Sequence, residues 1–199
     1  MTSTTKWQPR IALASGSPRR ASILRALGVP FSAFATAADE TLIAGEEGVV
    51  AAERLARVKA AAGAKDESLP VLAADTIVVR QGEIYGKPES AEDARRMLDE
   101  LQGHTHEVIT GVCIQWGEVI RSGVERTAVR LAKMRPEERD WYVKTGEPLD
   151  KAGAYNIEGL GAMFIAEVRG SPSNVAGLPV GLLRSLVREA GVDLGWPER

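Results

Sequence analysis

Apolar residues follow two different patterns along the chain. A short apolar run occupies residues 10–14, and a longer run rich in β-branched side chains occupies 69–79. The run at 69–79 is typical of a central strand that is covered on both faces. Two further stretches, 107–116 and 118–132, flank a tight Gly-Glu turn. Two runs about a tight turn also predict an antiparallel hairpin.

Apolar positions with a helical period lie between and after these runs. The first helix is predicted at residues 17–28, with Ser17 as its N-cap and Pro18 at the first helical position. Further helices are predicted at 46–63, at 90–103 behind a capping-box spacing of Ser90 and Asp93, at 135–146 behind Pro136, and at 178–191. Residues 153–177 are rich in glycine and are expected to form strand and loop.

These elements predict an α/β or α+β class with a mixed sheet, and we expect α/β; strands and helices are mixed without a strict βαβ rhythm, and the hairpin adds antiparallel strands. A chain of 199 residues lies near the upper end of single-domain length. The sequence contains no repeat and no linker-like stretch. We therefore expect one domain, residues 1–199, built from two closely joined lobes.

Composition excludes several classes of protein. Hydrophobic residues make up 44% of the chain and charged residues 26%, as in soluble globular proteins. The net charge of -2 argues against a nucleic-acid binder, because binding the phosphate backbone needs a basic face. No apolar run approaches the roughly 18 residues of a membrane helix, and residues 1–10 lack the apolar stretch of a signal peptide. We expect a cytoplasmic protein with neither a membrane nor a nucleic-acid partner.

Side chains that bind soft metals or act as nucleophiles are scarce. Cys113 is the only cysteine and lies in an apolar run, which indicates a buried strand residue. His104 and His106 follow a glycine that ends a predicted helix, and this position favours an exposed turn over a metal-binding pair. No Ser-His-Asp or Cys-His arrangement, Walker A loop or strand-GxGxxG-helix motif is present.

The stretch "LASGSPRR" places a turn between the first strand and the first helix. Ser15, Ser17, Arg19 and Arg20 surround the start of this helix. Free backbone N–H groups, hydroxyl groups and guanidinium groups together form a site of the size of a phosphate. The alternative is that Ser17 merely caps the helix while both arginines are solvated.

Asp75 lies inside an apolar run, where an ionised carboxylate is costly unless a cation or a metal lies against it. Glu40 can supply a second carboxylate, and a pair of acids without histidine or cysteine suits Mg²⁺. Lys59, Lys87 and Lys151 can join the arginines in neutralising a polyphosphate. The alternatives are a structural aspartate bound by the backbone, a solvated loop glutamate and three surface lysines.

Six motifs in order resemble those of the Maf family of nucleoside triphosphate pyrophosphatases, also called septum-formation-inhibitor proteins. They are "LASGSPRR", "ADTIVV", "GKP", "TGV", "DKAGAYNIEGLGAMFI" and "GSPSNVAGLP", and the match extends from about residue 11 to residue 190. The resemblance implies a cytoplasmic, metal-dependent hydrolase that cleaves a nucleoside triphosphate between its α and β phosphates. It also implies a homodimer and an elongated fold, like that of inosine-triphosphate pyrophosphatases, with the site in a cleft between two lobes.

The resemblance also assigns roles to individual residues. Ser15, Ser17, Arg19 and Arg20 match the phosphate-binding signature, and Glu40, Lys59, Asp75 and Lys87 match the polar positions of the active site. Asp75 matches the proton acceptor. Together with the reasoning from the residues, this predicts that Asp75 and Glu40 hold Mg²⁺, with Mn²⁺ as a substitute because it accepts the same oxygen ligands.

The choice of base depends on three further matches. Arg19, Thr76 and the segment around Lys151 resemble family members that prefer dTTP and UTP. Glu158 departs from that group, which has glutamine there, and matches the group that prefers 7-methyl-GTP. A carboxylate only accepts hydrogen bonds, whereas an amide also donates them, so broader use of nucleotides is an alternative.

Two hypotheses from other functional classes compete with the assignment as a dTTP/UTP pyrophosphatase. A nucleotide-binding regulator of septum formation would bind nucleotide without turnover. A structural protein would carry these motifs by coincidence. The acid and cation set favours turnover, because carboxylates repel a triphosphate unless a metal is present.

Overall fold

The computed structural model describes residues 8–64 and 68–196. Residues 1–7, most of the N-terminal segment without an apolar stretch, lie outside the described part. The strands are β1 (Ile11–Ala14), β2 (Phe31–Phe34), β3 (Val71–Arg80), β4 (Glu83–Tyr85), β5 (Thr105–Trp116), β6 (Val119–Leu131) and β7 (Ile165–Arg169). The α-helices are α1 (Pro18–Ala26), α2 (Gly48–Ala64), α3 (Ala91–Leu101), α4 (Pro136–Lys144), α5 (Pro172–Val175) and α6 (Val180–Glu189), and the 3₁₀ helices are η1 (Glu147–Asp150), η2 (Ala152–Ala154) and η3 (Leu160–Phe164).

All the strands belong to one mixed sheet, as the sequence predicts. The strand order is β2-β1-β3-β5-β6-β7, and β4 pairs with β3 beside this path. The strands β2, β1 and β3 are parallel, whereas the remaining pairs are antiparallel. The short strand β1 pairs with only the first residues of β3, since Leu13 lies opposite Leu72. The middle of β3 therefore extends beyond the end of β1.

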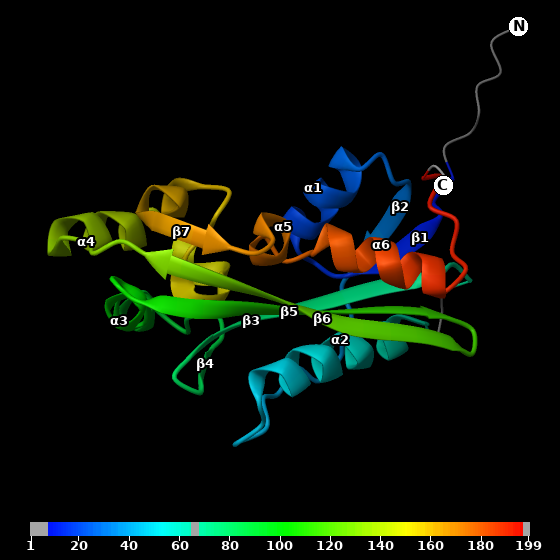
Figure 1. Cartoon of the computed structure of the whole chain (residues 1–199), viewed down its shortest axis with the longest axis horizontal. Helices are drawn as coiled ribbons and strands as arrows, with labels where there is room; N and C mark the ends of the chain where they lie inside the picture. Colours follow the sequence, from blue (N-terminus) through cyan, green and yellow to red (C-terminus); the bar gives the residue numbers. More distant parts are fainter. Residues whose placement is uncertain (1–7, 65–67, 197–199) are drawn as a thin grey trace, which may run out of the picture.

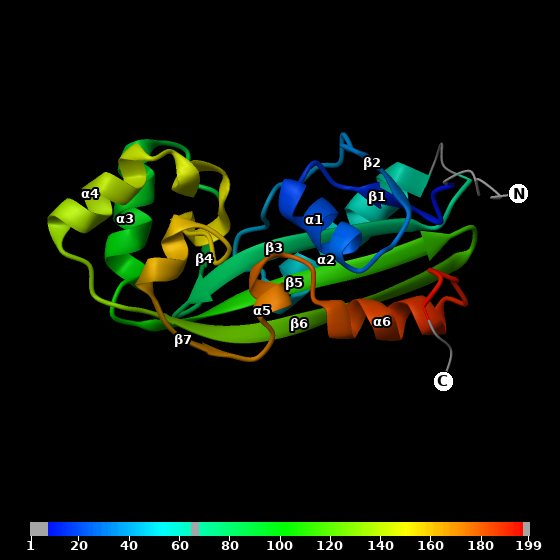
Figure 2. The same cartoon turned by 90° about the horizontal axis from the view of Figure 1, so that it is seen from above.

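Helices cover the long strands β3, β5 and β6 in two groups (Figure 1). In the first lobe, α2 lies on one face of the sheet, and α1 and α6 lie on the opposite face. In the second lobe, α3, α4 and the 3₁₀ helices gather at the other end of the same strands, next to β7 (Figure 2). The two-lobed arrangement expected from the sequence is confirmed, with one sheet shared by both lobes.

Each lobe has its own apolar core. In the first lobe, Leu24 of α1 and Leu183 of α6 pack with Val112 of β5. In the second lobe, a separate cluster includes Leu98 of α3 and Tyr142 of α4. Burial of such side chains contributes about 1.5–3 kcal/mol each, so either lobe supplies a stable wall for a site between them.

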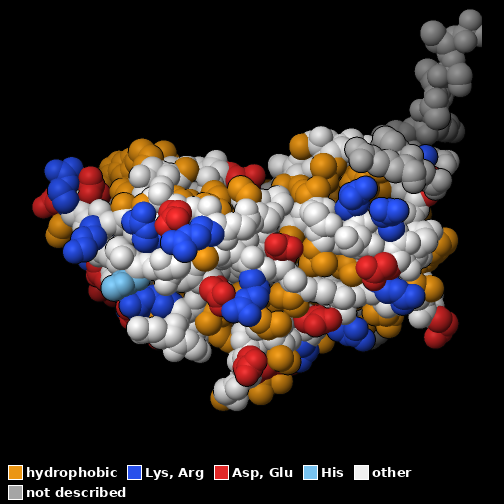
Figure 3. Space-filling view, viewed as in Figure 1, with side chains coloured by type: hydrophobic (Ala, Val, Ile, Leu, Met, Phe, Trp, Pro, Cys, Tyr) orange, Lys and Arg blue, Asp and Glu red, His pale blue; other side chains and the backbone are white. Residues whose placement is uncertain are grey.

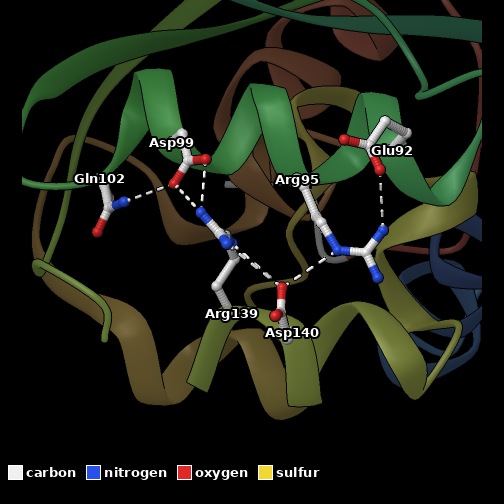
Figure 4. Close-up of polar contacts among 6 residues, drawn as sticks. All are labelled: Glu92, Arg95, Asp99, Gln102, Arg139 and Asp140. Carbon is white, nitrogen blue, oxygen red and sulfur yellow. Dashed lines mark hydrogen bonds and ion pairs between the residues drawn. The ribbon is translucent and has the colours of Figure 1, made fainter. Parts of the chain in front are cut away.

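Charged side chains join α3 and α4 at the end of the second lobe (Figure 4). Arg139 donates to Asp99 at 2.5 Å, and Asp140 accepts from Arg95 at 3.1 Å. The close-up adds Glu92, which pairs with Arg95, and Gln102, which donates to Asp99. Partly exposed pairs of this kind stabilise only modestly, so this network orients the two helices more than it holds the fold together.

Most of the predicted elements are confirmed. Helix α1 begins at Pro18, α4 begins at Pro136, and the Ser90 hydroxyl accepts from the backbone N–H of Asp93. The hairpin is antiparallel, and Cys113 is buried in β5. The strands β2 and β4, the 3₁₀ helices and helix α5, which lies where strand and loop were expected, were not predicted, because these segments are too short to show a clear period.

The expectation of an exposed turn is wrong for His106. His106 is buried at the start of β5, and its Nε2 lies 2.8 Å from the hydroxyl of Tyr155. The two rings also meet edge to face. His104, by contrast, is exposed. The histidines therefore do not form a pair, and His106 belongs to the core of the second lobe.

The buried imidazole predicts a pH-dependent stability. Burial, with a smaller effect from Arg80, lowers the pKa of His106 from 6.5 to about 4. Between these values the unfolded chain binds a proton that the folded chain does not, so the free energy of unfolding falls as the pH falls. We expect His106→Gln to remove up to about 3 kcal/mol of this loss between pH 6.5 and pH 4. Urea unfolding of wild type and His106→Gln at a series of pH values measures this difference in the free energy of unfolding.

The other histidine supplies the control for this measurement. His104→Gln should keep the pH dependence of the wild type, because this side chain is exposed. If the free energy of unfolding changes with pH equally in wild type and in His106→Gln, the buried imidazole does not cause the pH dependence.

The described surface and the described helices have the features that the composition predicts. Charges of both signs are mixed over the described residues of the face drawn in Figure 3. A search of the described helices finds none with the length and apolarity that a bilayer span requires.

Candidate active site

The turn after β1 leaves the start of α1 open to a cavity. Ser17 is the N-cap of α1, but its side chain makes no capping hydrogen bond. Instead, the backbone N–H of Ser17 donates to the hydroxyl of Ser15 at 3.2 Å. Pro18 follows at the first helical position and has no N–H to satisfy. The Ser17 hydroxyl and the positive end of the helix are therefore available to an anion.

Arg20 is fixed by three hydrogen bonds from its guanidinium group. Nε donates to the carbonyl oxygen of Gly177 at 2.8 Å, Nη1 to the Ser15 hydroxyl at 3.0 Å and Nη2 to the Thr76 hydroxyl at 3.1 Å. Burial lowers the pKa of Arg20 from its ordinary value, while nearby Asp75 opposes that shift. A guanidinium group keeps its charge under these conditions. Arg20 thus supplies a fixed positive charge beside the turn.

A buried polar chain supports Thr76 and Arg20 from behind. The Thr76 hydroxyl lies 3.0 Å from that of Thr110, which donates to the backbone carbonyl of Asn174 at 3.1 Å. The Asn174 amide donates to the carbonyl of Val108 at 2.9 Å. Reasoning from the sequence missed Thr110 and Asn174, although the motifs "TGV" and "GSPSNVAGLP" contain them. The Thr76 hydroxyl already makes hydrogen bonds with Thr110 and Arg20, so fewer of its hydrogen-bonding positions remain for a nucleotide base. Thr76 therefore acts first as a support for Arg20.

Two carboxylates meet at one buried lysine. Lys59 Nζ lies 2.5 Å from Asp75 Oδ1 and 2.8 Å from Glu40 Oε2. Lys59 and Asp75 are both buried, at 7% and 8% exposure, whereas Glu40 is exposed in the loop after β2. Lys59 supplies the cation that Asp75 requires inside an apolar strand. The pairing also holds Glu40 beside Asp75, although the two residues come from different elements.

The approach of α2 to the sheet depends on a glycine. Gly111 of β5 lies opposite Asp75 in the register of the sheet. A Cβ atom at Gly111 would overlap the backbone carbonyl of Ala52 in α2. Only glycine lets the helix lie this close, and Lys59 of the same helix then reaches Asp75. The glycine of the "TGV" motif therefore serves the geometry of the site.

One cavity of about 400 Å³ brings these groups together between the lobes. The first-lobe wall contains Ser15, Ser17, Arg19, Arg20, Glu40, Lys59, Asp75 and Thr76. The second-lobe wall contains Lys87, Asp150, Lys151, Ala152, Tyr155 and Asn156. All the site residues predicted from the sequence line this cavity except Glu158.

The second-lobe wall carries polar groups that the sequence did not single out. Arg19 Nη1 donates to Asn156 Oδ1 at 3.4 Å, and Lys151 pairs with Asp150. Partial burial lowers the pKa of Arg19, and Asp150 is the strongest of the charges that oppose this shift. Glu158 is exposed, and its backbone N–H donates to Asn156 Oδ1 at 3.2 Å. Asn156 therefore lies between Arg19 and Glu158.

Comparison with known protein families identifies the family to which this chain belongs. A model of the family described as Maf-like protein matches residues 10–190. The chain belongs to the Maf family. The match includes every residue that lines the cavity, from Ala14 to Val175.

Relatives within the Maf family are similar over almost their whole length. A dTTP/UTP pyrophosphatase of Anaeromyxobacter sp. (strain Fw109-5) is 50% identical over 94% of this chain and 92% of its own. A dTTP/UTP pyrophosphatase of Myxococcus xanthus (strain DK1622) is 45% identical over 95% of this chain and 96% of its own. Among solved structures, the Staphylococcus aureus Ham1 protein covers 90% of this chain and 98% of its own, with 17% identity and a TM-score of 0.53. This likeness confirms the fold expected from the sequence.

Proposed function

We propose that this protein is a nucleoside triphosphate pyrophosphatase that hydrolyses dTTP and UTP to the monophosphate and pyrophosphate. The observation that carries the proposal is the position of the Glu40–Lys59–Asp75 cluster beside the open start of α1, inside one cavity. Cations for a polyphosphate and carboxylates for a metal and a water thus lie within reach of one ligand. The names of the relatives support the same reaction.

The triphosphate binds against the first-lobe wall in this proposal. Ser15, Ser17 and the start of α1 supply hydrogen-bond donors, and Arg20 supplies a fixed charge. Lys87, which is exposed at the second-lobe wall, closes over the phosphates from the other side. These groups offset the charge that builds on the pyrophosphate leaving group.

The carboxylates fit a hard divalent cation. Among the described residues no group of three or more His, Cys, Asp or Glu side chains offers a complete set of metal ligands. Two carboxylates at one point suit Mg²⁺, which takes one or two protein carboxylates and completes its shell with phosphate oxygens and water. Glu40 and Asp75 would hold the ion, and Mn²⁺ accepts the same ligands. When bound, the ion supplies charge stabilisation at the phosphate oxygens.

Proton transfer is assigned to the same pair of acids. Asp75 is held in one orientation by Lys59, with Oδ1 engaged in the ion pair. Its second oxygen can accept a proton from the attacking water or orient that water toward the α-phosphorus. Glu40 can share this task from its exposed loop. Lys59 pairs with both acids and so holds them side by side.

The base binds against the second-lobe wall, near Arg19, Lys151 and Asn156. Glu158 lies outside the lining but contacts Asn156 through its backbone. We therefore expect Glu158 to affect the choice of base only indirectly, through its contact with Asn156. Homodimer formation and a cytoplasmic location stay predictions from the family resemblance.

Pyrophosphate release tests the proposed function. We expect Mg²⁺-dependent release from dTTP and UTP to exceed release from CTP and 7-methyl-GTP, and excess EDTA to abolish it. Glu158→Gln should keep this preference within about twofold, because the side chain at 158 does not line the cavity. Preference for 7-methyl-GTP that reverts in Glu158→Gln would replace the proposed substrate. Nucleotide binding without any release would indicate a regulator.

A further inference from the structure

The glycine pair of "EGLGAM" encloses a carboxylate instead of a phosphate. Glu147, at the start of η1, accepts hydrogen bonds from the backbone N–H of Leu160 at 3.0 Å and of Gly161 at 2.9 Å. The Tyr142 hydroxyl donates to the same carboxylate at 2.9 Å. A Cβ atom at Gly159 would overlap the Glu147 carboxylate. The glycine permits the backbone to wrap around the acid.

This carboxylate is charged and acts only as an acceptor. Partial burial raises the pKa of Glu147, but the hydrogen bonds from Gly161, Leu160, Tyr142 and Asn156 together outweigh burial and lower that pKa below its usual range. Every partner that surrounds the carboxylate is a donor. A neutral amide at this position would have to place an N–H group against one of these donors.

Asn156 connects the enclosed carboxylate to the cavity. Its backbone N–H donates to the Tyr142 hydroxyl at 3.1 Å, and that hydroxyl donates to Glu147. The side-chain Nδ2 of Asn156 and the Glu147 carboxylate both lie beside Gly159. The Oδ1 of Asn156 accepts from Arg19 at 3.4 Å. Because Glu147 cannot donate, the NH₂ group of Asn156 has to face Glu147 and the oxygen has to face Arg19. Asn156 and Arg19 both line the cavity, whereas Glu147 lies behind them.

We infer that Glu147 is a positioning residue: through Asn156 it holds Arg19 as a hydrogen-bond donor that faces the second-lobe wall and favours pyrimidines with a 4-oxo group over those with a 4-amino group. The inference rests on the proposed function. Arg19 has only donors, and one of them is taken by Asn156. The N–H groups left for a ligand match the carbonyl oxygens of uracil and thymine. The 4-amino group of cytosine would place donor against donor.

Glu147→Gln tests this role with little change in shape. The amide cannot accept from all its donors at once, so Asn156 loses its single orientation and Arg19 loses its fixed partner. We expect the ratio of kcat/KM for UTP to that for CTP to fall about tenfold, mainly through a higher KM for UTP. The inhibition constant of inorganic tripolyphosphate, which has no base, should stay within about twofold of wild type.

Two further variants separate positioning from general loosening of the lobe. Asn156→Ala removes the connection itself and should lower the UTP:CTP ratio as much as Glu147→Gln does. The double variant should then add little to either single change, because both act on the same path. Glu137→Gln makes the same chemical change at an exposed position in the first turn of α4 and should leave the ratio unaltered.

The possible outcomes are distinct. A wild type that releases no pyrophosphate from any nucleotide contradicts the proposed function. A selective wild type whose UTP:CTP ratio survives both Glu147→Gln and Asn156→Ala overturns the inference about Glu147. A parallel loss of tripolyphosphate binding also overturns it, because the effect would then extend to the phosphate groups. If Glu147→Gln fails to fold, Asn156→Ala still tests the connection to Arg19, and an unchanged UTP:CTP ratio in that variant overturns the inference.

Discussion

Asp75→Asn should lower pyrophosphate release by about 10³-fold or more at saturating Mg²⁺, with little change in the folded structure. The amide has nearly the same shape as the carboxylate, but it neither accepts a proton from water at neutral pH nor attracts a divalent cation. Lys59 would still pair with Glu40 in this variant, so the buried ammonium keeps a counter-charge. The loss should therefore appear mainly in kcat. Steady-state kinetics and a thermal unfolding curve measure both parts of the expectation.

Asp193→Asn is the matched control for this experiment. Asp193 pairs with Arg10, and its side chain is 76% exposed. Removing a charge there tests whether the loss of one acid is itself harmful to turnover, and we expect near-normal release. Release within tenfold of wild type from Asp75→Asn at saturating metal would exclude Asp75 as the proton acceptor and as an essential metal ligand.

The sequence predicts the first half of this site because the signals there are local. The strand, the turn at Ser15 and Ser17 and the start of α1 all lie within residues 10–20. Asp75 stands out because an acid in an apolar strand has a large cost unless it is paired. The identity of its partner is not local, since Lys59 comes from α2 and Glu40 from the loop after β2. The cluster could be assigned from the sequence only through the family resemblance.

Several side chains behind the cavity and in the core of the second lobe were hidden in the sequence. Thr110 resembles any β-branched residue of a buried strand, so the pattern gives no sign of its hydrogen bonds. Glu147 resembles a solvated glutamate at a helix end, and its two backbone donors lie 13 and 14 residues further along the chain. His106 follows a glycine that favours a turn, but its contact with Tyr155 spans 49 residues. Long-range packing decides the role of each of these side chains.

Lys59→Met should destabilise the fold as well as abolish turnover. The ammonium group is the direct partner of Asp75, which is only 8% exposed. Without it, a carboxylate remains buried with no paired cation, and breaking a buried pair in this way costs about 3–5 kcal/mol. We expect the free energy of unfolding to fall by about 3 kcal/mol, because half-exposed Glu40 relaxes into water and part of the cost is relieved. Urea unfolding in a metal-free buffer measures the change.

The double variant Lys59→Met/Asp75→Asn identifies the cause of that loss. If the unpaired charge is responsible, removing the carboxylate should restore stability, and the double variant should be more stable than Lys59→Met alone. Lys87→Met provides the control, since this exposed lysine of the same cavity should change stability by less than about 0.5 kcal/mol. A double variant that is no more stable than Lys59→Met would show that the unpaired carboxylate is not the cause of the loss.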